Sequence, residues 1–200
     1  MNLPQDVYCN PLPLPDYPEG IACREAMAGS DLFIGPRADY RELADPEMLY
    51  DEGLWYIFPS GHQAYVSRDL VHWDYRPIEI EGDLGYAPTI ARCGDRYHLT
   101  ASSLFRSPVS RMFTAPSPLG PYRNLGEIKD GRGQALPTEY LDPSLFCDDD
   151  GRLYLYWGYG PDGGGVFGLE LDPENPTRGI GEPVRLFDFD GANEFEHFGD

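Results

Sequence analysis

The stretch TEYLDPSLFCDDDGRLYLYWG, residues 138–158, decides the fold of this chain. Within it, the pair Asp142-Pro143 precedes a short apolar run, and a turn of three Asp and one Gly leads into an alternating apolar run at 153–157. Both runs have the length of a strand, and Asp and Gly tolerate the positive φ that tight turns require. The pattern therefore predicts a β-hairpin, with the carboxylate of Asp142 where its first strand begins.

Two other stretches share this pattern. In residues 43–58 the pair Asp45-Pro46 precedes an apolar run, and an Asp-Glu-Gly turn leads into a second run. In residues 86–100 an Ala-Pro pair takes the place of Asp-Pro, and a Cys-Gly-Asp turn follows. The hairpins recur about every fifty residues, the length of a β-propeller blade of four short strands. The sequence therefore predicts an all-β repeat protein, with blades over about 38–80, 83–128 and 136–187.

Composition supports short strands and limits the partners. The 200 residues include 20 Pro and 23 Gly, and 14% are aromatic, which favours many strands and turns over long helices. Fifteen basic residues stand against 34 acidic ones, so the formal net charge is −19, which repels the phosphate backbone of nucleic acids. No apolar run approaches the roughly 20 residues that span a bilayer. Neither nucleic acid nor a membrane is therefore an expected partner.

The N-terminal residues 1–36 are predicted to be a Pro-rich lead-in packed on the propeller, because their Pro residues fix φ and withhold hydrogen-bond donors. Residues 37–200 are assigned to the propeller, a domain that is incomplete at its C-terminus. The first twenty residues contain neither a basic start nor an apolar segment, so a cytoplasmic location is expected. The four cysteines form no C-x-x-C pair, and in that location they are expected to be free thiols.

Several motifs, in this order along the chain, together resemble glycoside hydrolase family 43. They are Asp45-Pro46, YVSRDLVHW at 65–73, Tyr86-Ala87-Pro88, SPLGPY at 117–122 and above all LDPSLFCDDDGRLYLYWG at 141–158. The family consists of five-bladed β-propellers that include β-xylosidases, α-L-arabinofuranosidases and endo-arabinanases. The resemblance runs from about Asn10 to the end of the chain. It implies a five-bladed propeller of which the chain covers about three blades and the approach to the fourth.

The resemblance also implies roles for individual residues. Asp45 falls on the family's general base, and Asp142 falls on the aspartate that orients the general acid and modulates its pKa. Tyr86 stands where the family often places an aromatic ring against the bound sugar, a position where an aromatic residue would equally pack into the propeller core. The acid itself is a Glu in a Glu-Gly-Pro-like motif of the fourth blade, which neither Glu194 nor Glu196 matches. The chain by itself is therefore expected to be inactive.

The two aspartates also have a chemical rationale of their own. Hydrolysis of a glycosidic bond needs an acid for the leaving oxygen and a base for water, and inverting enzymes separate these carboxyls by roughly 6.5–9.5 Å. A third carboxylate near the acid raises the pKa of that acid by like-charge repulsion. A single Asp before Pro usually only starts a turn, but two at equivalent positions of a repeat favour a catalytic interpretation.

Metal-ligand spacing is not visible among the His and Cys residues, and the Asp148-Asp149-Asp150 run is interpreted as a solvated turn. No cofactor and no metal site are therefore expected, although the resemblance allows a structural Ca²⁺ in the complete propeller.

The prediction is an inverting glycoside hydrolase that acts on oligosaccharides derived from plant polysaccharides, at terminal or internal linkages of xylose or arabinose. Two alternatives stay open. One is a non-catalytic propeller that binds carbohydrate or protein on the same scaffold. The other is a related fructan-cleaving enzyme, which typically has an Asn-Asp-Pro-Asn-Gly-like motif where this chain has ADPEM at 44–48.

Overall fold

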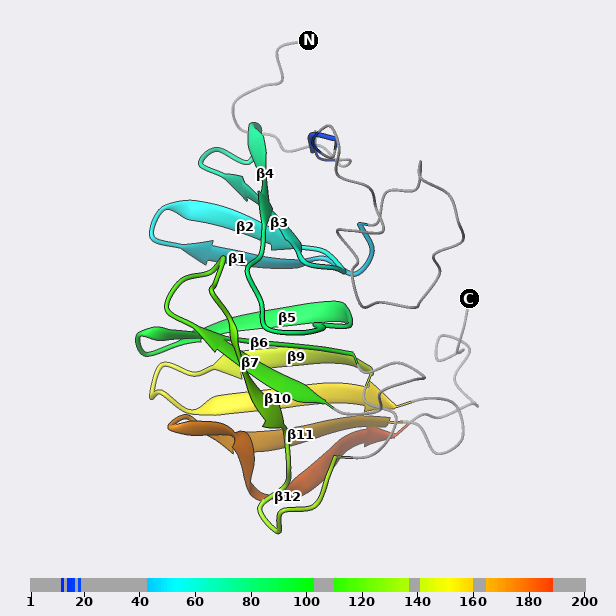
Figure 1. Ribbon diagram of the computed structural model, residues 1–200. Coiled ribbons are helices and arrows are strands. Elements are labelled where there is room, and N and C mark those ends of the chain that lie inside the picture. The colour runs from blue at the N-terminus through cyan, green and yellow to red at the C-terminus, as the bar shows by residue number, and fades with distance from the viewer. Residues whose placement is uncertain are drawn as a thin grey trace.

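The computed structural model describes residues 12, 14–16, 18, 43–102, 110–136, 141–159 and 165–188. The secondary structure in these ranges consists of β-strands joined by turns (Figure 1). Within the same ranges, no helix has the length and apolar character needed to cross a membrane. The expectation of an all-β chain is therefore confirmed.

The strands form three sheets of four, which we call blades 1 to 3. Blade 1 contains β1 (Glu47–Asp51), β2 (Leu54–Phe58), β3 (Gln63–Ser67) and β4 (Trp73–Pro77). Blade 2 contains β5 (Tyr86–Cys93), β6 (Arg96–Ser102), β7 (Arg111–Ala115) and β8 (Arg123–Glu127). Blade 3 contains β9 (Leu141–Cys147), β10 (Leu153–Tyr159), β11 (Gly165–Asp172) and β12 (Asn175–Asp188).

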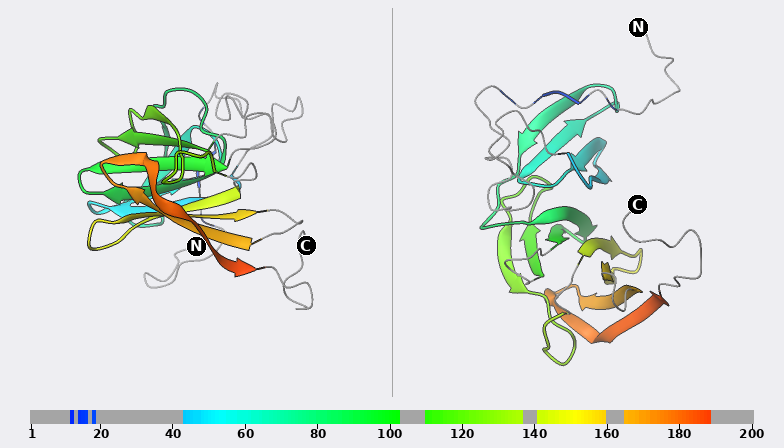
Figure 2. Two further views of the ribbon diagram at one scale, coloured as in Figure 1. Left: turned by 90° about the horizontal axis from the view of Figure 1, so that it is seen from below. Right: turned by 90° about the vertical axis from the view of Figure 1, so that its right-hand side faces the viewer.

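Each blade is an antiparallel meander, because strands that follow one another in sequence are neighbours in the sheet. The three sheets follow one another along an arc in the right-hand view of Figure 2, from cyan through green to orange. This is the arrangement of successive blades in a β-propeller. The predicted approach to a fourth blade, including Glu194 and Glu196, lies outside the described residues.

The predicted turns form because their residues accept positive φ. Between β1 and β2, Glu52 and Gly53 have φ of 48° and 82°, and Asp51 pairs with Leu54, so the two residues make a tight hairpin loop. In blade 2, Gly94 with φ of 62° starts the loop between the paired residues Cys93 and Arg96. Both turns lie at the far end of the first strand from the residue that precedes Pro.

The first strands of the three blades, β1, β5 and β9, run side by side in the same direction, and we call them the inner strands. At their starts, hydrogen bonds connect blade 1 with Ala87 and blade 2 with Asp142. At their ends, Arg92 Nη1 donates to Asp51 Oδ1 at 2.6 Å, and Cys93 is bonded to Cys147. Contacts at both ends therefore hold the inner strands in register.

Two apolar cores lie between the blades. The core between blades 1 and 2 is built around Phe58, Leu99 and Phe113, all of them completely buried. The core between blades 2 and 3 includes Met112 and Trp157. Burying one such large side chain contributes about 1.5–3 kcal/mol, so the two cores supply the main force that joins the blades.

The opposite face of blade 1 carries a third apolar cluster, formed by Ile57, Tyr65 and Trp73. Leu12 and Leu14 of the lead-in pack against this cluster. Most of the lead-in lies outside the described residues, so its role as a strap over the propeller stays a prediction.

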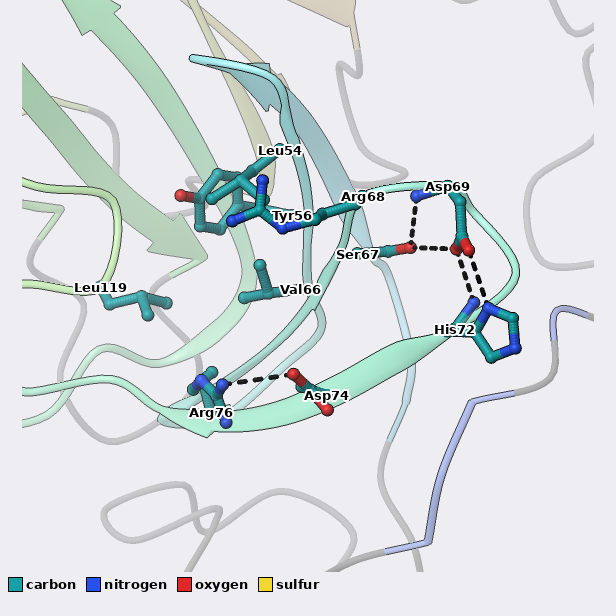
Figure 3. A pocket seen from close by; sticks show the side chains of 10 residues that line it. All are labelled: Leu54, Tyr56, Val66, Ser67, Arg68, Asp69, His72, Asp74, Arg76 and Leu119. Atoms are coloured by element: carbon teal, nitrogen blue, oxygen red, sulfur yellow. Dashed lines mark hydrogen bonds and ion pairs between the residues drawn. The ribbon is translucent and has the colours of Figure 1, made fainter.

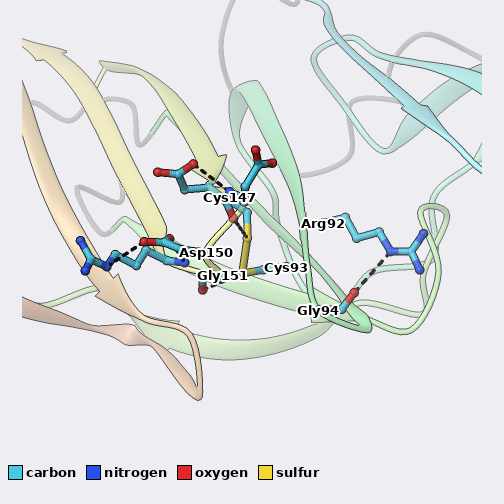
Figure 4. The surroundings of a disulfide bond; sticks show 9 residues. Arg92, Cys93, Gly94, Cys147, Asp150 and Gly151 are labelled. Carbon is cyan, nitrogen blue, oxygen red and sulfur yellow. Dashed lines mark hydrogen bonds and ion pairs between the residues drawn. A yellow bond between two sulfur atoms is a disulfide. The ribbon is translucent and has the colours of Figure 1, made fainter.

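The expectation of free thiols is wrong for two of the four cysteines. Cys93 and Cys147 form a disulfide, with their Cα atoms 5.6 Å apart and a sequence separation of 54 (Figure 4). They are close because Cys93 ends β5 and Cys147 ends β9, the same place in two neighbouring blades. The hairpin pattern of the sequence already contained this equivalence, but the assumed reducing compartment outweighed it.

Candidate functional site

Three backbone corners mark the starts of the inner strands. Asp45, Ala87 and Asp142 have φ of 51°, 48° and 44°, and each immediately precedes a Pro. Residues other than Gly rarely adopt positive φ, and a residue before Pro is normally extended. Such a conformation costs on the order of 1–3 kcal/mol and persists only where surrounding contacts enforce it, often at functional sites. The three blades thus repeat one unusual corner.

Carboxylates occupy the first and third of these corners. Asp45 lies two residues before the start of β1, Asp142 is the second residue of β9, and both residues are exposed. Between them, at the start of β5, the corner residue is the buried Ala87, which has no charge. The two predicted catalytic residues therefore lie at the same end of the inner strands, on either side of an uncharged corner. Their individual roles stay predictions.

A buried serine hydroxyl holds each of the last two corners. Ser60 Oγ accepts the N–H of Ala87 at 3.1 Å and donates to the carbonyl of Ala44 at 3.2 Å. Ser102 Oγ accepts the N–H of Asp142 at 2.8 Å and lies 3.4 Å from the Oδ1 of the same residue, to which it donates. Neither serine was selected from the sequence, because its partner lies in the next blade.

Thr89 makes a further contact between inner strands. Its Oγ1 accepts the N–H of Leu145 at 2.9 Å in a buried position. This bond ties the middle of β5 to the middle of β9, just inside the corners. The uncharged hydroxyl of Thr89 thus has a structural role at the blade 2–blade 3 boundary.

Tyr86 begins β5, between the two aspartate corners in chain order. It is half-buried and pairs with Ser102 across the β5–β6 ladder. It belongs to neither apolar core between the blades. This position is compatible with the predicted stacking of its ring on a sugar, which stays a prediction.

Two titratable groups, one at the start of β1 and one at the boundary of blades 1 and 2, are partly removed from water. Burial raises the pKa of Glu47, the first residue of β1. Burial also lowers the pKa of His62, an effect that Asp83 partly opposes. His62 Nε2 accepts the N–H of Leu84 at 3.3 Å, which requires that nitrogen to be unprotonated. A neutral imidazole therefore helps to join blades 1 and 2 near the corners.

The opposite ends of the inner strands carry charge as well, but in a paired form. Tyr97 Oη donates to Asp51 Oδ2 at 2.5 Å, while Arg92 pairs with the other carboxylate oxygen. Burial and the neighbouring Asp51 raise the pKa of Tyr97. The carboxylate of Asp51 is thus fully engaged in joining blades 1 and 2, in contrast to the carboxylates at the corners.

A pocket of about 430 Å³ lies on the outer part of blade 1, against Leu119 of blade 2 (Figure 3). None of the predicted site residues lines it. Its polar wall is a turn in which Asp69 accepts hydrogen bonds from the side chain and amide of His72 and from the amide of Val71, and these hold the pKa of Asp69 well below its usual range. This pocket is therefore separate from the candidate site.

Among the residues that the structure describes, no three His, Cys, Asp or Glu side chains are grouped so that they could hold a metal ion. The structural Ca²⁺ that the family resemblance allows in the complete propeller stays a prediction.

Two curated relatives share the greater part of the chain. The extracellular endo-α-(1→5)-L-arabinanase of Thermotoga petrophila is 30% identical, in an alignment over 71% of this chain and 39% of the relative. The extracellular endo-α-(1→5)-L-arabinanase 2 of Bacillus subtilis is 25% identical, over 70% of this chain and 38% of the relative. The chain thus spans about two fifths of the length of these relatives.

The names of these relatives contradict the expected cytoplasmic location, because both arabinanases are extracellular. The location expected from the composition of the first twenty residues is therefore wrong. The disulfide between Cys93 and Cys147 agrees with the correction, since such bonds persist mainly in oxidising compartments.

The fold of the chain is also similar to that of a solved structure. The solved structure of an endo-arabinase from Bacteroides thetaiotaomicron superimposes with a TM-score of 0.57 at 23% identity, covering 74% of this chain and 57% of that one. The family model for glycosyl hydrolases family 43 matches residues 40–188, which include all three blades and both aspartate corners. The chain belongs to glycosyl hydrolases family 43.

Proposed function

We propose that the protein is an inverting glycoside hydrolase that cleaves pentose linkages in chains derived from plant polysaccharides. The main support is the corner geometry, in which the carboxylates of Asp45 and Asp142 occupy two equivalent, strained positions at one end of the inner strands. Backbone conformations of this kind cluster at functional sites, which supports a catalytic role for both residues.

In this proposal Asp45 is the general base. It takes a proton from the water molecule that attacks the anomeric carbon, while the leaving oxygen receives a proton from the acid on the other face of the sugar. Its exposed position beside the start of β1 leaves room for that water.

Asp142 has a different role. Its negative charge raises the pKa of the acid, so that the acid is still protonated at neutral pH. The acid is a Glu of a further blade, and residues 1–200 supply two of the three carboxylates. We therefore expect these residues alone to be inactive.

Arabinose is the first sugar to test, and xylose is the second. The two relatives described above are both arabinanases, and both are extracellular, so we infer that the protein acts on arabinan outside the cell. Tyr86, half-buried between the corners, is the candidate aromatic residue for stacking on the apolar face of a sugar. Because carboxylates carry both proton transfers, the reaction as proposed needs no cofactor.

The test uses the full-length protein on arabinan, on an aryl α-L-arabinofuranoside and on an aryl β-D-xyloside. Proton NMR of the first product reveals its anomeric configuration. Turnover with inversion supports the proposal, whereas retention contradicts the roles of base and acid. Binding of arabinan without any turnover would instead favour the alternative of a non-catalytic propeller.

A further inference from the structure

We infer that Ser102 is a positioning residue, which fixes both the backbone and the carboxylate of Asp142; the inference rests on the role proposed for Asp142. Among the described residues, this hydroxyl is the only group that forms hydrogen bonds with both the backbone and the carboxylate of Asp142. It accepts the backbone N–H at 2.8 Å and donates to Oδ1 at 3.4 Å. One hydroxyl can do both at once, because it has one proton and two lone pairs.

The strain at Asp142 makes this contact necessary. With φ of 44° before a Pro, the residue would relax toward extended backbone if nothing held it. Relaxation would turn the carboxylate away from the direction in which the corner presents it. Ser102 comes from β6 of blade 2, is 1% exposed and is held by its pairing with Tyr86, so it is a rigid anchor.

Blade 1 provides a matched comparison. Ser60 has the same relation to Ala87 as Ser102 has to Asp142, and it is equally buried. Its proton, however, goes to the carbonyl of Ala44, because Ala87 has no carboxylate. Ser60 therefore holds a corner without holding a charged group.

Blade 3 shows that the hairpin itself does not depend on the hydroxyl. Gly158 pairs with Leu141 there, just as Ser102 pairs with Tyr86 in blade 2. A Cβ at Gly158 would meet only the carbonyl oxygen of Leu141, at 3.8 Å, so a serine would fit. The ladder thus forms with glycine at this position, and the particular contribution of Ser102 lies in its two bonds to Asp142.

The experiment compares four variants of the full-length protein. Ser102→Ala should lower kcat/KM about ten- to a hundredfold, the size expected when a functional group is displaced by a small distance. It should also move the basic limb of the pH–rate profile to lower pH, in the same direction as Asp142→Asn. Ser102→Thr keeps the hydroxyl, so its basic limb should lie at the same pH as that of the natural protein. Ser60→Ala loses an equivalent buried bond and should lower Tm while leaving the basic limb in place.

A second measurement does not depend on activity. Amide hydrogen exchange at Asp142 should become faster in Ser102→Ala and remain slow in Ser60→Ala, because only the former removes the acceptor of that N–H. If Ser102→Ala does not fold, Ser102→Gly takes its place, since Gly158 shows that the ladder accepts glycine.

The outcomes separate the inference from the proposed function. If the basic limb of the pH–rate profile stays in place in Ser102→Ala but moves in Asp142→Asn, only the positioning role of Ser102 is overturned. An unmoved limb in Asp142→Asn overturns the role of Asp142. In a protein that turns over no pentoside the proposed function fails, and unchanged exchange at Asp142 in Ser102→Ala would then overturn the anchoring as well.

Discussion

Asp45 and Asp142 adopt the same unusual backbone conformation, with φ of 51° and 44°, each directly before a Pro at the start of an inner strand. Sequence alone identifies both as Asp-Pro pairs, but a dipeptide of this kind usually only starts a turn. The shared conformation makes the two positions structurally equivalent, and the uncharged corner at Ala87 separates them. The two carboxylates therefore lie at one end of the propeller on either side of an uncharged corner, and we predict a different role for each.

Substitution of the proposed base should affect every substrate. Asp45→Asn removes the group that accepts a proton from water, so kcat of the full-length protein should fall about 10²- to 10⁴-fold. Steady-state kinetics on arabinan and on an aryl arabinofuranoside measure the effect. Asp74→Asn, an exposed change on β4, is a suitable control and should leave kcat unchanged. A loss of less than threefold in Asp45→Asn would exclude Asp45 as the base.

Substitution of the second aspartate should move the pH profile. The acid works only while protonated, so the rate falls as pH rises through the pKa of the acid. Asp142→Asn removes a negative neighbour, which lowers that pKa, and the basic limb should therefore move to lower pH. A pH–rate profile of kcat/KM measures the shift. A basic limb that stays in place, or moves to higher pH, would contradict this role.

The disulfide should stabilise the contact between blades 2 and 3. It closes a loop with a sequence separation of 54, so chain entropy gives an upper value of about 4 kcal/mol for its contribution to the free energy of unfolding. Cys93→Ser, Cys147→Ser and the double variant should lose similar amounts in urea denaturation. Reductant should lower the stability of the natural protein and leave the double variant unaffected. A double variant as stable as the natural protein would show that the bond does not contribute.

A buried histidine should make the fold sensitive to acid. Burial, with a smaller effect of Arg96, lowers the pKa of His98 to about 4, and only 3% of this side chain is exposed. The unfolded chain then binds a proton more readily than the folded one between about pH 6.5 and 4, so stability is lost as pH falls through this window. The loss attributable to His98 should reach on the order of 3 kcal/mol at the acid end.

Urea denaturation at pH 7 and pH 4.5 measures this dependence, with His98→Gln as the variant that cannot titrate. His72→Gln is the matched control, because His72 is exposed and its removal should leave the effect of His98 intact. An equally steep loss of stability in His98→Gln and the natural protein would show that other groups cause it.

The sequence predicted those parts of the fold that depend on local features. Apolar runs of strand length with Gly, Asp and Glu turns between them located the first two strands of each blade, and the turn at Glu52-Gly53 has the expected positive φ. The last strand of each blade was not located. Trp73, the last residue of the YVSRDLVHW motif, begins β4 and is buried in the third apolar cluster. Likewise β12 contains two Pro residues and several register shifts, which hide the alternation that marks a strand.

The candidate site was only partly predictable, because its support comes from distant residues. The two aspartates could be selected from their Asp-Pro motif. Ser60 and Ser102 could not, since their hydrogen bonds reach 27 and 40 residues along the chain into the next blade. What distinguishes each serine is its position in the β-ladder, where it lies opposite the residue that precedes the corner of its own blade. Only the assembled blades reveal it.

The most direct test of the two assigned roles is the dependence of each variant on the leaving group. In the full-length protein, kcat is measured for Asp45→Asn and Asp142→Asn on two pentosides of the same sugar, one with an aryl and one with an alkyl leaving group. An aryl oxygen needs little protonation, so it should partly restore the rate of Asp142→Asn, while Asp45→Asn should remain slow on both because water still lacks its base. Recovery of Asp45→Asn by the aryl group, or equal losses of Asp142→Asn on both substrates, would contradict the account.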